Sequence, residues 1–198
     1  MRVIKYLMIV SIILLPNMNA CYHQNVTSAI VEVDCTKISH VPKAIPGTPN
    51  ISISSSHCKD YQFNLRSIKL ALDIFVQEYS SSFDITEDEA WLLLSGLHIE
   101  VSAIPRTVKA AYTVDGKLLE GDVPVSGLAL NKNLIWVEIK TSQIWSSALV
   151  HELIHTIIWR KNIVHADPDH EGKEFSGWTK KHTELIKRIN KILLDAEI

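Results

Sequence analysis

The residues best suited to chemistry form one short stretch, His151, Glu152 and His155, within an apolar segment that runs from Ile144 to Trp159. Residues four apart on an α-helix lie about one turn apart on the same face, so both imidazoles can bind one metal ion. Two histidines at this spacing, with a glutamate after the first, form the H-E-x-x-H pattern of zinc hydrolytic sites. The sequence therefore predicts a helix that carries two ligands for Zn²⁺.

Glu152 has a different role in this pattern. Zinc with an open coordination position lowers the pKa of a bound water to about 7. A carboxylate beside that water can accept its proton and then pass it to a leaving amine. We therefore expect peptide-bond hydrolysis on a peptide or protein substrate, with Glu152 as the general base.

The residues around the motif are apolar on nearly every face of the predicted helix, which indicates that the helix is buried. Burying a carboxylate and two imidazoles without compensation is unfavourable, and a metal ion supplies that compensation. This argument favours a metal site over the alternative, a hydrogen-bonded histidine pair in an ordinary core.

A catalytic zinc usually has three protein ligands, so His151 and His155 need a partner. We predict that His170, fifteen positions after His155, is the third ligand. The alternatives in the same part of the chain are His165, Glu174 and Glu184.

Composition limits the class of protein. With 198 residues, of which 46% are hydrophobic, the chain can bury one sizeable core. A formal net charge of -2 gives no basic surface for nucleic acid, so we expect no nucleic-acid partner. We expect a monomeric protein.

Residues 1–20 have the pattern of an export signal peptide. Arg2 and Lys5 supply the positive start, and the apolar stretch Leu7 to Leu15 ends before Pro16. That stretch has nine residues, and a membrane-spanning helix needs about 20. The prediction is export followed by cleavage.

Three cysteines follow the predicted signal. The sequence from Met18 to Cys21 resembles a bacterial lipobox, which implies lipidation of Cys21 and anchoring to the membrane of a bacterial cell envelope, periplasmic or surface. The alternative is ordinary cleavage after Ala20. In an exported protein Cys35 and Cys58 form an even pair, so we predict a disulfide, with two free thiols as the alternative.

Residues 21–60 are rich in proline and serine, and we expect a tether or N-terminal arm, with one strand over Val26 to Val33. Residues 61–198 are then the metallopeptidase-like domain. Apolar spacing, capping residues and alternation predict further helices over Asn64 to Ser80, Thr86 to Leu94 and Gly177 to Asp195, and strands over Leu97 to Ser102, Val108 to Val114 and Leu134 to Ile139.

The expected fold is α+β. A mostly antiparallel sheet lies beside the active-site helix, which Ser142 caps, and the C-terminal helix packs behind the site. Between Ile104 and Leu130, glycines and a proline indicate turns and a hairpin, with Gly127 among the turn residues.

The stretch after His155 is similar to the SprT-like zincin metallopeptidases, in which H-E-x-x-H precedes a loop that ends near H-G-x-x-F. Gly172 and Phe175 match that ending, although Glu171 separates His170 from Gly172. The resemblance runs from about Leu134 to Ile192 and implies a zincin-like fold and a Zn²⁺ cofactor.

In zincins a tyrosine or histidine often stabilises the oxyanion, and Tyr112, His165 and His182 are candidates here. The metzincin pattern is excluded, because Lys161 stands where its third histidine would be. The alternative functions are a non-catalytic zinc-binding envelope lipoprotein, in which Glu152 would have no role, and an envelope lipoprotein without metal.

Overall fold

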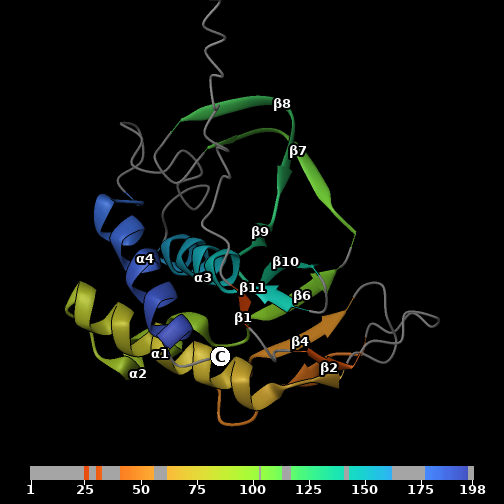
Figure 1. The fold of residues 1–198 in the computed structure, drawn as a ribbon. Helices are drawn as coiled ribbons and strands as arrows, with labels where there is room; N and C mark the ends of the chain where they lie inside the picture. The colour runs from red at the N-terminus through yellow and green to blue at the C-terminus, as the bar shows by residue number, and fades with distance from the viewer. Residues whose placement is uncertain are drawn as a thin grey trace, which may run out of the picture.

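The computed structural model describes residues 25–26, 30–32, 41–55, 62–102, 104–112, 117–140, 143–161 and 177–195. They form an α+β fold, as predicted (Figure 1). The helices are α1 (Leu65–Phe83), α2 (Glu87–Leu94), α3 (Ser146–Arg160) and α4 (Lys180–Asp195). The strands are β1 (Asn25–Val26), β2 (Ile30–Glu32), β3 (Lys43–Ala44), β4 (Ser52–Ser55), β5 (Gln62–Phe63), β6 (His98–Ser102), β7 (Arg106–Tyr112), β8 (Leu118–Val125), β9 (Gly127–Asn131), β10 (Leu134–Lys140) and β11 (Gln143–Trp145).

The main sheet is mixed. Its order is β3-β4-β6-β10, after which β9 and β11 both pair with β10, and β1 pairs with β11. Most of these pairings are antiparallel, as expected, but the two central ones, β4 with β6 and β6 with β10, are parallel. Parallel neighbours need long crossover connections, and here α1 and α2 supply the first of them.

Alternation along the central strands separates the two faces of the sheet. Ile99 and Val101 on β6, with Ile135 and Val137 on β10, are buried in the hydrophobic core that the helices share. On the other face, His98 lies between two serines of β4, with Ser52 Oγ 2.9 Å from Nδ1 and Ser54 Oγ 2.9 Å from Nε2. These contacts support the parallel register of β4 and β6.

The helices begin and end where local chemistry predicts. Asn64 caps α1, and its Oδ1 accepts a hydrogen bond from the Ser67 N–H at 3.2 Å. Thr86 and Glu89 form a reciprocal capping box at the start of α2. The helices α1 and α2 and the C-terminal helix α4 are therefore confirmed, with boundaries within a few residues of those predicted.

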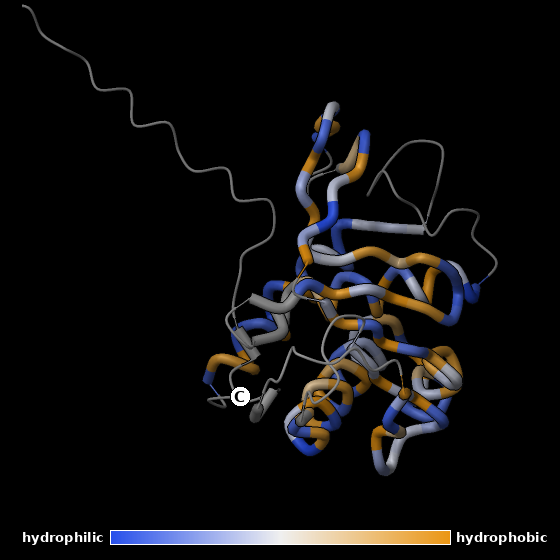
Figure 2. The backbone as a smooth tube through the Cα atoms, turned by 90° about the vertical axis from the view of Figure 1, so that its right-hand side faces the viewer, coloured by the Kyte–Doolittle hydropathy of each residue, from blue (hydrophilic) through white to orange (hydrophobic). Residues whose placement is uncertain are grey.

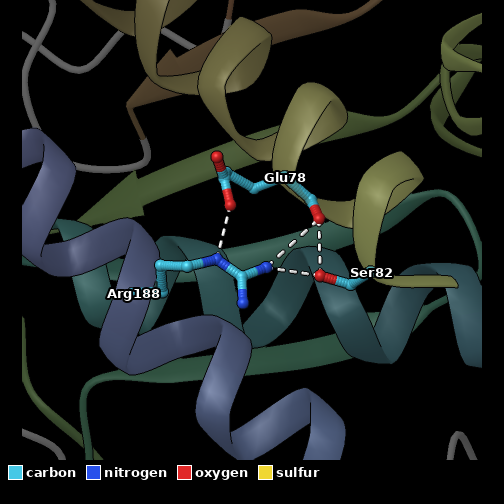
Figure 3. Close-up of polar contacts among 3 residues, drawn as sticks. All are labelled: Glu78, Ser82 and Arg188. Atoms are coloured by element: carbon cyan, nitrogen blue, oxygen red, sulfur yellow. Dashed lines mark hydrogen bonds and ion pairs between the residues drawn. The ribbon is translucent and has the colours of Figure 1, made fainter.

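Helix α4 is fixed against α1 by a charged contact as well as by apolar packing. Arg188 Nε donates to Glu78 Oε2 at 2.5 Å, and the same guanidinium donates to Ser82 Oγ (Figure 3). Ser82 Oγ also donates to the Glu78 carbonyl at 2.6 Å, so the three residues form one network. The network fixes the position of α4 along α1.

The strands β7 and β8 form an antiparallel hairpin that extends away from the body of the fold (Figure 1). It confirms the hairpin predicted between Ile104 and Leu130. Most of its described side chains are exposed. Hydrophobic and hydrophilic residues are interspersed along the whole described backbone (Figure 2). In the described part of the chain, no helix combines the length and apolar content that a bilayer crossing requires.

Three predicted boundaries were wrong. Residues 41–55, expected in an arm outside the domain, contribute β3 and β4 to the main sheet, and Ile45, Ile51 and Ile53 lie in its core. The single strand expected over Val26 to Val33 is instead two short strands, β1 and β2. Helix α3 begins at Ser146, because the preceding residues form β11 and pair with β10.

Candidate functional site

Helix α3 presents His151 and His155 to each other in the protein interior. Each side chain is 8% exposed, and their Nε2 atoms are 2.9 Å apart. The apolar residues on the rest of the helix explain this placement, because α3 packs against β9, β10, α2 and α4. The predicted buried helix with two facing imidazoles is present.

At 2.9 Å the two Nε2 atoms are within hydrogen-bonding distance, so the spacing suits either one imidazole donating to the other or two ligands of one metal ion. Two imidazoles that bind zinc at about 2.05 Å in tetrahedral geometry have nitrogens about 3.3 Å apart. The Nε2 atoms of His151 and His155 are within a few tenths of an ångström of that value. A small outward rotation of either ring would match it, so this pair fits two positions of a zinc site.

Glu152 lies against the edge strand β9. Its side chain is 5% exposed, and burial raises its pKa to about 8, while a hydrogen bond from the Ala129 backbone N–H opposes the rise. Burial disfavours the charged form, so this carboxyl group holds a proton near neutral pH more readily than a surface carboxyl group does. The structure therefore gives Glu152 an environment that differs from that of a surface carboxylate.

Gly127 lets the carboxyl group of Glu152 lie this close to β9. A Cβ atom at position 127 would be 2.6 Å from Glu152 Oε1 and 2.8 Å from Cγ, and such contacts are not tolerated without movement. Gly127 was predicted as a turn residue, but it is the first residue of β9, where its missing side chain makes room for the carboxyl group.

Trp178, just before α4, covers the histidine pair. Its ring centroid is 4.8 Å from that of His151 and 4.8 Å from that of His155. The indole is 1% exposed, and its Nε1 donates to Thr183 Oγ1 at 3.1 Å. The C-terminal helix packs against α3, as predicted. Trp178, which precedes that helix, contacts the two imidazoles.

His182, one of the candidates for oxyanion stabilisation, has a different place. Its ring stacks on Phe83 with centroids 4.3 Å apart, and its Nδ1 accepts a hydrogen bond from the Thr179 N–H. Burial, and then repulsion from Lys161, lowers its pKa to about 4. A neutral histidine in an aromatic cluster is a packing residue, so the structure does not favour His182 as an oxyanion donor.

The candidates for the third ligand are mostly outside the described residues. His165, His170 and Glu174 lie in the segment 162–176, which is not described. Glu184 is described and is exposed on α4, where its carboxylate is 3.8 Å from Lys180 Nζ. Among the described residues no three His, Cys, Asp or Glu side chains are grouped as metal ligands, so Glu184 does not join the pair.

Other predictions concern residues of which the structure gives no side chain or no position. Tyr112 lies on β7, and its side chain is not described. The signal peptide, Cys21, Cys35 and Cys58 also fall outside the described residues. The predictions of lipidation and of a disulfide are therefore untested.

Comparison of the chain with protein families, curated proteins and solved structures gave no significant match. The resemblance to SprT-like zincins therefore remains a hypothesis from the motif. The functional argument rests on the chemistry of α3, β9 and Trp178.

Proposed function

We propose that the protein is a zinc-dependent endopeptidase. The observation that carries the proposal is the geometry of α3, where two imidazole nitrogens face each other at 2.9 Å and a buried carboxyl group follows the first histidine. A structural zinc site does not need that carboxyl group, whereas zinc-dependent hydrolysis needs it as a proton acceptor. The SprT-like resemblance is consistent with the same function and implies a zincin-like fold.

His151 and His155 would hold the ion through Nε2, with a third ligand from the segment after α3, for which His170 is our candidate. When bound, zinc would supply Lewis acidity and lower the pKa of a coordinated water to about 7. Glu152 accepts a proton at its carboxylate and then donates it to the amine that leaves.

The strand β9 supports a polypeptide substrate. It is joined to β10 on one side, and the N–H of Ala129 reaches Glu152, so the backbone of β9 runs beside the general base. The Ala129 N–H is occupied by Glu152, so an extended peptide would pair with other backbone groups of β9, and this would bring its own backbone to Glu152 and the histidines. Main-chain pairing of this kind favours cleavage within a chain.

The decisive experiment measures zinc content and cleavage of casein or a peptide library together. Wild type should contain stoichiometric zinc and lose activity to a chelator. Glu152→Gln keeps the size of the side chain but cannot accept the proton, so it should retain zinc while hydrolysis falls by about 10² or more. Zinc without hydrolysis in wild type would indicate a binding protein, and the absence of zinc would contradict both functions.

The third ligand needs its own pair of variants. His170→Ala should lose zinc and thermal stability, because metal binds only the folded protein. His165→Ala is the control and should retain both. If His165→Ala alone loses zinc, the ligand assignment changes and the peptidase proposal stands; if neither does, Glu174 is the next candidate.

We also propose, from the sequence alone, that the protein is an exported lipoprotein anchored to the bacterial cell envelope through Cys21.

A further inference from the structure

Among the residues that the structure describes, the imidazoles of His151 and His155 have the indole of Trp178 as a common aromatic neighbour. The indole of Trp178 lies 4.8 Å from each ring, with interplanar angles of 38° and 40°. The two imidazole centroids are 4.7 Å apart, so the three rings form a nearly equilateral group. A single side chain therefore restrains both rings at once.

The indole is itself held in place. Its Nε1 donates to Thr183 Oγ1 on the first turn of α4, and His182 lies 5.6 Å from its ring and stacks on Phe83 of α1. Farther along α4, Arg188 binds α1 (Figure 3). Trp178 cannot shift without breaking these contacts, so α4 acts as a rigid support behind the histidine pair.

We infer that Trp178 is a positioning residue that holds His151 and His155 in the orientation that binds metal, an inference that rests on the proposed zinc site. Each histidine has two side-chain torsions, and ordering free rotors weakens binding. Rings already restrained by the indole, with their Nε2 atoms facing each other, avoid that loss. The apolar surface of the indole also keeps water from one side of the rings.

Substitutions can separate the properties of Trp178 that restrain the histidines. The side chain is aromatic, large and anchored by its N–H. Trp178→Phe keeps an aromatic face and loses the anchor, Thr183→Val keeps the indole and removes the acceptor, and Trp178→Leu removes the aromatic face. Leu193→Ala is the matched control, because Leu193 is a buried residue near the other end of α4.

The experiment measures zinc affinity by competition with a chromophoric chelator, and visible absorption with Co²⁺ in place of zinc, on full-length protein. Trp178→Leu should bind zinc about 10- to 100-fold more weakly, the range found when groups that support metal ligands are removed. Its Co²⁺ spectrum should also change, because the spectrum depends on ligand geometry. The zinc affinities of Trp178→Phe and Thr183→Val should lie between those of Trp178→Leu and wild type.

Leu193→Ala should lower the melting temperature while leaving zinc affinity and the Co²⁺ spectrum unchanged. The inference is overturned if Trp178→Leu binds zinc like wild type, or if Leu193→Ala weakens zinc as much as Trp178→Leu does. If wild type itself takes up no zinc, the proposed function fails and this inference fails with it. A wild type that binds zinc beside an unaffected Trp178→Leu overturns this inference alone.

Discussion

The position of the Glu152 carboxyl group on α3 depends on the absence of a side chain at Gly127 on β9. A methyl group at position 127 would overlap Glu152 Oε1, so Gly127→Ala must displace the carboxyl group or the strand. We predict that Gly127→Ala retains zinc but lowers hydrolysis by about 10-fold or more, because the proton acceptor leaves its position. Overpacking should also lower the free energy of unfolding by about 1–3 kcal/mol.

A double-mutant cycle checks this assignment. In a Glu152→Gln background, adding Gly127→Ala should cause no further loss of activity, since the group that Gly127 accommodates no longer accepts a proton. A further loss equal to that of Gly127→Ala in wild type would show that Gly127 acts on catalysis through some other contact.

His182 gives a pH-dependent prediction. Burial lowers its pKa to about 4 in the folded protein, compared with about 6.5 in an unfolded chain. The unfolded state therefore takes up the proton first, and folding stability is lost as the pH falls from about 6.5 to 4. The loss from this residue should approach about 3 kcal/mol.

Urea unfolding of the metal-free protein at several pH values measures that loss. His182→Asn cannot titrate but keeps an acceptor for the Thr179 N–H, so its stability should fall less between pH 7 and 4.5 than that of wild type. If the free energy of unfolding falls equally with pH in the two proteins, His182 is not the group that causes the loss of stability.

The sequence predicted those parts of the candidate site that depend on neighbouring residues alone. His151 and His155 are one helical turn apart, and that spacing alone places both imidazoles on one face. Gly127, which lies beside Glu152, and Trp178, which lies against both imidazoles, come from other parts of the chain. Nothing in their local sequence indicates which element they meet, so only the fold could identify them.

Arg160, the last residue of α3, connects three elements. Its guanidinium donates to the carbonyl of Lys132 and the side chain of Asn133 in the turn between β9 and β10. It also donates to the carbonyls of Leu93 and Ser95 at the end of α2. These bonds fix the C-terminal end of α3 against the turn that joins β9 to β10.

We predict that Arg160→Ala lowers the free energy of unfolding by about 2–4 kcal/mol, because several hydrogen bonds from one charged group are lost and two of their acceptors, the carbonyls of Leu93 and Ser95, are partly buried. Chemical denaturation measures the change. Arg66→Ala, an exposed arginine on α1, is the control and should change stability by about 0.5 kcal/mol or less. Equal effects of the two substitutions would contradict the role assigned to Arg160.

Elements with a complete local pattern were predictable. The apolar spacing of α1, the capping box of α2 and the alternation of β6 each specify one type of structure. The start of α3 was not, because Ile144 and Trp145 are apolar and suit a strand and a buried helix equally. The alternation of apolar and polar residues along a strand does not indicate which strand it pairs with, so the parallel pairings of β6 could not be derived from the sequence.

Strand β1, the first described element of the chain, is part of the main sheet. β1 begins at Asn25 and pairs with β11, which leads directly into α3. Cys21 is only four residues before β1, a span of at most about 13 Å at ~3.3 Å per residue. A lipid on Cys21 would therefore hold the domain close to the membrane, and not on the long tether expected from composition.

We predict that the mature chain begins at a lipidated Cys21. Mass spectrometry of the N-terminal peptide from membrane fractions should find the acylated cysteine, and Cys21→Ser should move the protein to the soluble fraction. An unmodified Cys21, or a mature chain that begins elsewhere, would contradict lipidation without affecting the proposed zinc site.

The parallel pairing of β6 with β10 is the non-local step in assembling the main sheet. The residues between these two strands include the hairpin β7–β8 and β9, so the pairing must close a long loop. By contrast, β9, β10 and α3 follow one another closely along the chain, so β9 can lie beside Glu152 before that loop is closed. We therefore expect the surroundings of the two imidazoles and of Glu152 to form from nearby segments, while the parallel centre of the sheet is completed by one of the slowest steps of folding.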